Sequence, residues 1–508
     1  MVAILLTQAA GLLRGVVVYR AFGTGGELDS FNAANRVAEM LFNLMAGGAL
    51  GSAFIPTFTG LLARQNRPAA WKLASAVANL LLMVLSVFSL LAWVFARPLV
   101  EHGLYLLAPG ESVGQIDLTT ALLRSLLPTV VIFGLSGLVM GVLNAHQRFW
   151  LPAIAPAMYS LGQIGGVLLF PEAWGIQRLA YGALLGSLLH LLVQLPDLLR
   201  QDGRYTPSLG LELGEVREVM RLMGPRILGV AVVQVNFIVN TMIALSLPEG
   251  SAAAIALAFT WMLMPQAAVA QAVAIAAMPT FSAQAALNQF GELRDTLAGA
   301  LRGVLLLALP AALGLALLRE PLIRWIYQHG PNFTAHSTEL VTFALLWYAL
   351  GLLGHSLLEV IVRAFYALHD TRTPVGVGVA AMALNILFSF AFSALFARLG
   401  WLPHGGLALA NSLATTLEMG LLLILVRRRL GGLQGRRILV ASCQAALAAL
   451  GMGAVLVSWL ALSAAAPAGL QVLGGAALGG LVYALLLLAL RVPEIGMLLH
   501  ALSRRLRR

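Results

Sequence analysis

The chain has 508 residues, of which 60% are hydrophobic and only 10% are charged, and its formal net charge is +11. Soluble proteins carry about 25% charged residues, so this composition excludes an ordinary soluble domain. The single cysteine, Cys443, excludes an intrachain disulfide.

Apolar segments recur along the whole chain, and many reach the roughly 20 residues that a helix needs to cross a bilayer. They predict an all-α polytopic membrane protein with about 14 transmembrane helices. The first segment lacks the basic start and the small-residue cleavage site of a signal peptide, so we expect it to be the first span. We place the spans at residues 2–19, 30–63, 70–96, 118–143, 152–171, 176–199, 216–247, 252–283, 296–318, 338–362, 375–397, 405–426, 438–462 and 469–490.

The positive charge follows the connections between these segments. Of the 32 Lys and Arg residues, 23 lie after even-numbered spans and six after odd-numbered spans. Because basic loops stay on the cytoplasmic side, this sorting places both termini in the cytoplasm. The tail SRRLRR, from Ser503, then lies at the cytoplasmic membrane edge and favours anionic headgroups. Topology accounts for the net charge, so we expect membrane lipids, and no nucleic acid, as partners.

Polar residues inside the first two spans mark a candidate substrate site. Arg14 lies deep in the first span, six residues after Gln8. A charge at the bilayer centre costs about 2.5–3.5 kcal/mol, so such a residue usually faces a bundle interior or a wet cavity. In the second span, Arg36 and Glu39 are three residues apart and Asn43 follows one turn later, so all three share a face. They predict either a cavity-lining site for an anionic substrate or a neutralised pair that packs against a neighbouring helix.

The second span continues into a glycine-rich stretch. Gly47 and Gly51 are four residues apart, with Gly48 between them, and this spacing permits close packing of membrane helices. Pro56 removes a backbone hydrogen bond further on, which favours a bend. The stretch therefore predicts either close packing alone or a hinge that lets one lobe rock against the other.

Two cytoplasmic connections resemble each other and indicate an internal repeat. In NAHQRFWLPAIAP, Ala145 lies seven residues before Pro152, and in YALHDTRTPVGVG, Ala367 lies seven residues before Pro374, so the offset is 222 residues. Six helices per repeat is an even number, so both repeats share one orientation in the membrane. We predict a six-helix lobe at 1–200, a second at 201–430, and two additional helices with the basic tail at 431–508.

The second lobe offers amides and carboxylates rather than buried arginines. Oxygens of Asn385, Asn411 and Glu418 suit a hard cation such as Na⁺, or the side chains form interhelical hydrogen bonds of about 0.6 kcal/mol each. The sequence contains no Walker-type phosphate loop, zinc spacing or nucleophile elbow, so we expect neither an enzyme nor a firm metal site. Without an ATPase domain, we expect transport driven by the membrane potential or by Na⁺, and no other cofactor.

Six segments together resemble the MurJ (MviN) lipid II flippases of the MOP exporter superfamily, and the resemblance runs over nearly the whole chain. They are AFGTGGELDSFNAA around Asp29, AGGALGSAFIP ending at Pro56, LLAPGE around Pro109, GVLNAHQRFWLPAIAPAMYS from Gly141, MGPRILGVAVVQVNFIVNT from Met223 and RAFYALHDTRTPV from Arg363.

The resemblance implies a flippase that moves a lipid-linked peptidoglycan precursor from the inner to the outer leaflet of the bacterial cytoplasmic membrane by alternating access. It implies that arginines in a central cavity hold the diphosphate, since guanidinium matches phosphate geometry. It also implies that the last two helices form a groove for the polyprenyl tail. We expect the lipid-linked glycan as the partner and a monomeric protein.

The resemblance carries over unevenly to the candidate site. Arg14 matches the second arginine of the family's first span, Asp29 its acidic residue after that span, and Arg36 a position that is often basic. At eight positions the chain departs from the family, whose usual residue is given in parentheses: Gln8 (Arg), Gly15 (Asp), Glu39 (Asn), Phe42 and Asn43 (both Arg), Gly47 (Glu), Phe259 (Asp) and Thr260 (Arg). We expect Arg14 to be the main diphosphate contact, helped by Arg36 and tuned by Glu39, with the other matched or exchanged polar positions nearby.

Three alternatives use the same scaffold. A flippase for a different lipid-linked oligosaccharide accounts for the neutral cavity positions. A cation-coupled exporter of small amphiphiles, like the multidrug members of the superfamily, would use Glu39, Glu359 and Glu418. The third alternative is a membrane scaffold without transport activity. The matched loop motifs favour the lipid II flippase.

Overall fold

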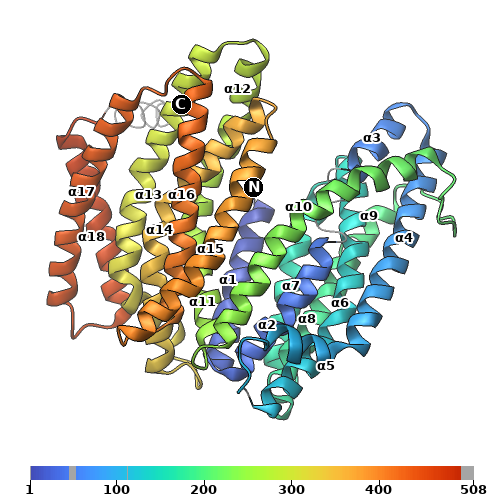
Figure 1. The fold of residues 1–508 in the computed structure, drawn as a ribbon, viewed down its shortest axis with the longest axis horizontal. Coiled ribbons are helices and arrows are strands. Elements are labelled where there is room, and N and C mark those ends of the chain that lie inside the picture. The colour runs from blue at the N-terminus through green and yellow to red at the C-terminus, as the bar shows by residue number, and fades with distance from the viewer. Residues whose placement is uncertain (1, 45–52, 111, 493–508) are drawn as a thin grey trace. The chain divides into compact units, whose positions relative to one another are not determined.

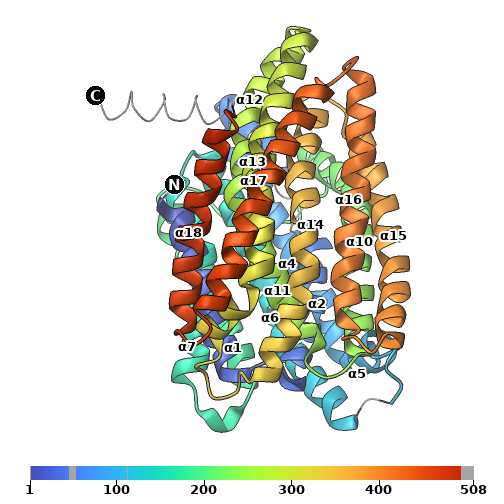
Figure 2. The same ribbon diagram turned by 90° about the vertical axis from the view of Figure 1, so that its left-hand side faces the viewer.

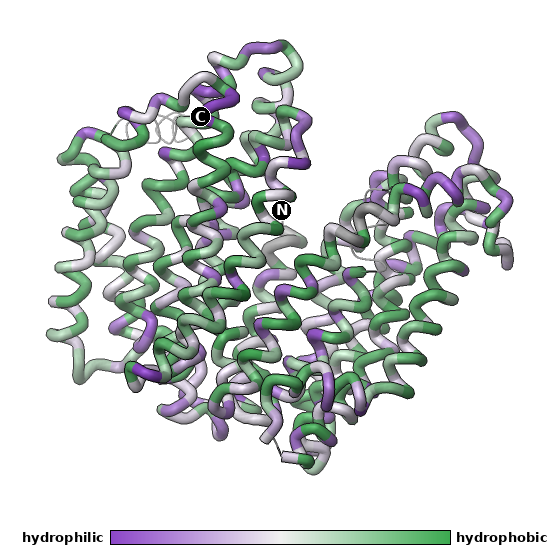
Figure 3. Tube along the Cα trace, viewed as in Figure 1, coloured by the Kyte–Doolittle hydropathy of each residue, from purple (hydrophilic) through white to green (hydrophobic). Residues whose placement is uncertain are grey.

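The computed structural model describes residues 2–44, 53–110 and 112–492. Within these ranges the chain forms helices and turns and no strand, as the apolar pattern predicts (Figure 1). Hydrophobic residues cover the helix bodies, and hydrophilic residues gather mainly at the helix ends (Figure 3). In the described part, eleven helices are long and apolar enough to cross a membrane, or twelve if Gly214–Gly224 and Gly229–Leu245 form one span. If α1 and α2 are counted in addition to these helices, the predicted number of about 14 transmembrane helices is compatible with the structure.

By packing, the chain divides into two compact units, of which the first comprises residues 1–253 together with 330–333. The helices of this first unit are α1 (Val2–Phe22), α2 (Gly26–Phe42), α3 (Ile55–Ala63), α4 (Arg67–Val94), α5 (Ala96–Leu99), η3 (Val100–Leu104), α6 (Val113–Ala145), α7 (Trp150–Leu169), η4 (Glu172–Trp174), α8 (Gln177–Leu192), α9 (Leu195–Leu199) and α10 (Gly214–Leu245). Helix α1 packs on α7, α2 packs on α6, and α7 packs on α8.

The second unit comprises residues 254–329 and 334–508. Its helices are α11 (Ser251–Gln266), whose first three residues pack with the first unit, η5 (Ala267–Gln271), α12 (Ala272–Ala286), α13 (Phe290–Tyr327), α14 (Ala335–Ala367), α15 (Arg372–Arg398), α16 (His404–Arg429), α17 (Gly435–Leu462) and α18 (Ala468–Ala489). Helices α17 and α18 lie side by side and pack on α13 (Figure 2). The Tyr483 hydroxyl fastens α18 to α13 by donating to the Leu306 carbonyl at 2.7 Å.

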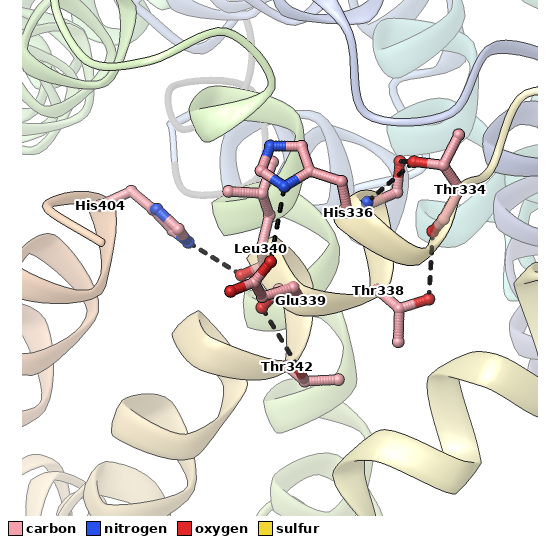
Figure 4. Close-up of polar contacts among 8 residues, drawn as sticks. Thr334, His336, Thr338, Glu339, Leu340, Thr342 and His404 are labelled. Carbon is pink, nitrogen blue, oxygen red and sulfur yellow. Dashed lines mark hydrogen bonds and ion pairs between the residues drawn. The ribbon is translucent and has the colours of Figure 1, made fainter. Parts of the chain in front are cut away.

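Helices α14 and α16 form a close pair in the second unit. The Thr334 hydroxyl caps α14 by accepting from the Ser337 N–H at 3.2 Å, and His404 Nε2, at the start of α16, donates to the Leu340 carbonyl at 2.8 Å (Figure 4). Further along the pair, a Cβ on Gly351 would lie 2.3 Å from the Ser412 hydroxyl oxygen, so only glycine permits this approach.

The offset of 222 residues found in the sequence reappears in the structure. Helices α6 and α14 are separated by 222 positions at both ends, and so are the starts of α7 and α15. The turns after α6 and α14 place Gln147 (φ 60°) and His369 (φ 57°) in the left-handed region. In each turn the next residue bonds back to the helix: Arg148 N–H to the Leu143 carbonyl, and Asp370 N–H to that of Phe365. Both are helix-ending turns of one common type, and the internal repeat remains a prediction.

The turn after α14 is tied to α15 and to the end of α16 by Asp370. Its carboxylate accepts from the Thr373 backbone N–H at 3.0 Å and from the Thr373 hydroxyl at 2.8 Å, and it pairs with Arg429. These contacts hold the pKa of Asp370 below its usual value. The largest contribution comes from the backbone N–H of Thr373, followed by the Thr373 hydroxyl and then by Arg429. The ionised carboxylate therefore stabilises the fold above the unfolded pKa of about 3.9, and this stability is lost as the pH falls through the lower folded pKa.

We expect Asp370→Asn to lower the midpoint of thermal unfolding at pH 7 and to have a smaller effect at pH 3, because the stability that the ionised carboxylate contributes declines once the pH is below its unfolded pKa of about 3.9. The measurement is thermal unfolding of the purified protein in detergent at both pH values. The exposed Asp202→Asn controls for the loss of a negative charge. An Asp370→Asn effect that is equally large at both pH values would contradict this role.

Candidate functional site

Arg14 reaches from α1 to α7 in the first unit. Its Nη1 donates to the Gln163 Oε1 at 3.4 Å, and Gln163 itself is 3% exposed. Arg14 is half-buried, so part of its guanidinium stays accessible. A guanidinium has five N–H donors, and this contact uses one of them. The arrangement orients Arg14 and leaves donors for an anionic ligand.

Two pairs of glycines fix the position of α7 against α8. A Cβ on Gly162 would lie 2.2 Å from the Gly186 Cα, and one on Gly166 would lie 2.5 Å from the Gly182 Cα. Gly162 and Gly166 are four residues apart on α7, and Gly182 and Gly186 are four residues apart on α8. This is the small-xxx-small spacing of closely packed membrane helices. The position of Gln163, and with it the orientation of Arg14, therefore depends on the contact between α7 and α8.

The predicted pair on α2 is present as an ion pair. Arg36 Nη1 lies 3.0 Å from Glu39 Oε2, and the other carboxylate oxygen accepts from Asn35 Nδ2 at 2.7 Å. The Arg36 guanidinium also lies 4.9 Å from the centroid of the Phe237 ring of α10, as in a cation–π contact. Glu39 and Phe237 thus hold Arg36, and its charge is compensated locally.

A pocket of about 320 Å³ lies beside this ion pair and is lined by α2, α6 and α7. Glu39 and Asn43 line it from α2, and Phe133 and Tyr159 line it from α6 and α7. Tyr159 lies within electrostatic range of both Arg14 and Glu39. The pocket therefore lies against the polar face of the second predicted span, and Arg14 is not among the residues that line it.

Asp29 lies away from this pocket and caps a helix. Its carboxylate is 3% exposed and accepts from the backbone N–H groups of Gly250 and Ala253 at 2.7 and 2.6 Å, at the start of α11. In return, Glu249 Oε1 accepts from the Gly26 N–H at 2.6 Å, at the start of α2. Each helix thus has a carboxylate from the other segment at its N-terminus: Asp29 of α2 for α11, and Glu249, just before α11, for α2. A carboxylate there accepts from backbone N–H groups that have no partner within the helix, and it interacts favourably with the positive end of the helix dipole.

The remaining predicted residues of the first site are not among those that line this pocket. Gln8 is exposed on α1. Thr260 is exposed on α11 in the second unit, where its hydroxyl donates to the Ala256 carbonyl at 2.8 Å. Pro56 lies in the first turn of α3, a position at which proline is common in helices. Gly47, Gly48 and Gly51 lie outside the described residues, as does the basic tail from Ser503.

The proposed cation ligands of the second unit are distributed over α15 and α16. Asn385 is 4% exposed on α15, Asn411 of α16 bonds to His355 Nε2 at 3.0 Å, and Glu418 of α16 faces α15 near Gly378. Within the ranges the structure describes, no group of three His, Cys, Asp or Glu residues is placed to hold a metal ion. The amide and carboxylate oxygens thus lie on neighbouring helices, and they remain a prediction for Na⁺.

Sequence reasoning missed several partners of the site. Asn35 precedes Glu39 by one helical turn, so the i, i+4 spacing was a usable signal. Gln163, Tyr159 and Phe237 gave no such signal because their helices come together with α1 and α2 only in the folded unit.

The comparisons with known proteins agree with this architecture. The family described as lipid II flippase MurJ matches residues 18–470. The lipid II flippase MurJ of Burkholderia cenocepacia is 31% identical over 439 residues, which are 84% of this chain and 82% of the relative.

Two solved structures show the same fold. A lipid II flippase MurJ in an inward closed conformation has a TM-score of 0.80 at 24% identity, covering 96% of this chain and 97% of that one. An inward-facing multidrug resistance MATE transporter has a TM-score of 0.70 at 15% identity, covering 84% and 96%. The multidrug neighbour shows a shared fold alone, whereas the family match spans most of the sequence. The chain belongs to the MurJ family of lipid II flippases.

Proposed function

We propose that this protein moves a polyprenyl-diphosphate-linked glycan, lipid II or a close relative, from the inner to the outer leaflet by alternating access. The family match over residues 18–470 carries this proposal. It is supported by the multi-pass helical fold and by an arginine placed inside the first unit. The role in the cell is the supply of precursor for peptidoglycan synthesis.

Arg14 is the diphosphate contact in this proposal. Its planar fork matches phosphate oxygens, and its contact with Gln163 leaves most of its donors available. Arg36 contributes less, because Glu39 compensates its charge at 3.0 Å. Asp29 acts through the position of α11, since its carboxylate is used by the backbone of that helix.

The protein resides in the bacterial cytoplasmic membrane as a monomer with both termini in the cytoplasm. This orientation is supported by the sorting of basic residues, 23 after even-numbered spans against six after odd-numbered ones. The lobes comprise 1–200 and 201–430, and 431–508 adds the last two helices. The membrane potential or Na⁺ bound at Asn385, Asn411 and Glu418 drives the transport.

A cation-coupled exporter of small amphiphiles is the less favoured alternative. Such an exporter needs accessible carboxylates, but Glu39 is paired with Arg36, and Glu359 is paired with Arg363 at 2.5 Å. Both carboxylates therefore neutralise an arginine of their own helix, which reduces their affinity for a transported cation.

The proposal predicts that the wild-type protein restores growth to bacteria depleted of their own lipid II flippase. The measurement is colony formation under depletion, with membrane insertion checked by immunoblotting and an empty vector as the control. Restored growth, together with lipid II in the outer leaflet, supports the proposal. Correct insertion without any restored growth contradicts lipid II as the substrate.

A further inference from the structure

The pocket between α2, α6 and α7 has a chemistry that differs from that of the arginine next to it. We propose that this pocket binds a sugar ring of the lipid-linked substrate, as a site separate from the diphosphate contact at Arg14. The inference rests on the proposed function, because it assigns one part of that substrate to one part of the first unit.

The size of the pocket limits what it holds. Its volume of about 320 Å³ lies at the lower end of the range of small-molecule sites, about 300–1,000 Å³. It has room for one ring-sized group rather than for a whole head group of sugars and peptide. The chemistry of its walls then decides which group.

One wall is made of aromatic rings. The centroids of Phe42 and Phe133 lie 5.8 Å apart, and those of Phe133 and Tyr159 lie 5.0 Å apart. A pyranose ring presents C–H groups on its faces and hydroxyl groups around its edge. An aromatic wall packs against such a face, and the phenol of Tyr159 adds a polar handle.

Other lining residues supply hydrogen-bonding groups. Glu39 accepts from Asn35 at 2.7 Å and retains further lone pairs on its oxygens. Asn43 lines the pocket as well, and its side-chain amide carries both a donor and an acceptor. These groups match the edge of a sugar, whose hydroxyl and acetamido groups both donate and accept.

The charge of the pocket argues against a phosphate. Its described lining contains no lysine or arginine, and the neighbouring Arg36 is compensated by Glu39. A diphosphate placed here would lie beside the Glu39 carboxylate, whereas the guanidinium of Arg14, which does not line the pocket, keeps the donors that its contact with Gln163 leaves unused. The two polar parts of the substrate are therefore recognised by different residues.

The aromatic wall is held from behind by a buried hydrogen-bond network. The Phe133 ring packs edge-on against His190 at 5.3 Å. His190 Nδ1 and the Ser136 hydroxyl share a hydrogen bond of 2.6 Å, and Gln194 Nε2 donates to the Ser136 oxygen at 2.8 Å. A wall fixed in this way reduces the entropy lost when a ring binds to it. His190, Ser136 and Gln194 are thus positioning residues.

The test compares two lipids on the purified full-length protein by native mass spectrometry: a bare polyprenyl diphosphate and the same lipid carrying a disaccharide. We expect the wild type to prefer the glycosylated lipid by about tenfold in affinity. We expect Phe42→Leu, which keeps an apolar side chain but removes the flat ring, to reduce this preference to about twofold or less. Asn43→Ala reduces it in the same direction.

Two matched variants separate this effect from general damage. Arg14→Ala lowers the affinity for both lipids by the same factor, because both carry the diphosphate. Phe170→Leu removes a ring from a different aromatic pocket, at the end of α7, and leaves both affinities unchanged. A Phe42→Leu variant that binds bare diphosphate as the wild type does is shown to be folded.

The inference is overturned if the wild type binds both lipids equally, if it binds neither, or if Phe42→Leu keeps the full preference. It is also overturned if Na⁺ raises the unfolding temperature of the wild type but not of a Glu39→Gln variant, while the wild type shows no preference for the glycosylated lipid. A wild type that restores growth but shows no preference contradicts the sugar site alone. A wild type that shows the preference but never restores growth contradicts the flippase function alone.

Discussion

Arg14→Ala is expected to abolish the ability of the protein to restore growth to flippase-depleted cells. A charge-assisted hydrogen bond is worth about 1.5–3 kcal/mol, so loss of the guanidinium should lower the affinity for a diphosphate lipid about 10- to 150-fold. Arg14→Lys should retain part of the activity, because lysine keeps the charge but not the planar fork. The measurements are growth under depletion and lipid binding by the purified protein.

The exposed Arg64→Ala is the matched control for Arg14, since it removes the same charge next to α3. It should leave growth and binding at the wild-type level. Gln163→Leu should weaken binding less than Arg14→Ala does, because it releases the guanidinium without removing it. Full growth with Arg14→Ala at normal expression would show that the diphosphate is held elsewhere.

The second large effect is expected at Asp29. Asp29→Ala leaves the buried N–H groups of Gly250 and Ala253 without their acceptor and removes a negative charge from the start of α11. Each unsatisfied buried group costs about 1–3 kcal/mol, so the two together are expected to cost about 2–6 kcal/mol. Growth should be lost, and the midpoint of thermal unfolding in detergent should fall by several degrees.

Asp29→Asn should lie between the alanine variant and the wild type, because the amide keeps one acceptor oxygen but not the charge. The control is Glu27→Ala, an exposed carboxylate in the same first turn of α2. Surface substitutions of that kind usually change stability by less than about 0.5 kcal/mol. Equal unfolding temperatures for Asp29→Ala and Glu27→Ala would show that the cap at α11 carries little stability.

The apolar pattern predicted the long helices well, because a span in lipid must satisfy its own backbone groups. The predicted span at 338–362 lies inside α14, and its helix continues at both ends through polar residues that apolarity alone does not include. The predicted span at 30–63 is less simple. Its described residues form α2 and α3, and Pro56 lies in the first turn of the second of these helices.

The site was predictable only where its contacts are local. The ion pair of Arg36 and Glu39 follows from their spacing of three residues, and the structure contains it. The contact of Arg14 with Gln163 joins residues 149 positions apart, and no local spacing encodes such a contact. Asp29 was singled out by family resemblance alone, because its partners are backbone groups, which the sequence does not distinguish.

The mutual capping of α2 and α11 has a consequence for biosynthesis. Asp29 and Glu249 satisfy helix ends that are more than 220 residues apart, and the Asn332 amide donates to the Ala21 carbonyl at the end of α1 at 2.6 Å. The ribosome must therefore complete residue 333 before the first helices have all their neighbours, and long loops close slowly. Helices that enter the membrane first are thus among the last to complete their final contacts.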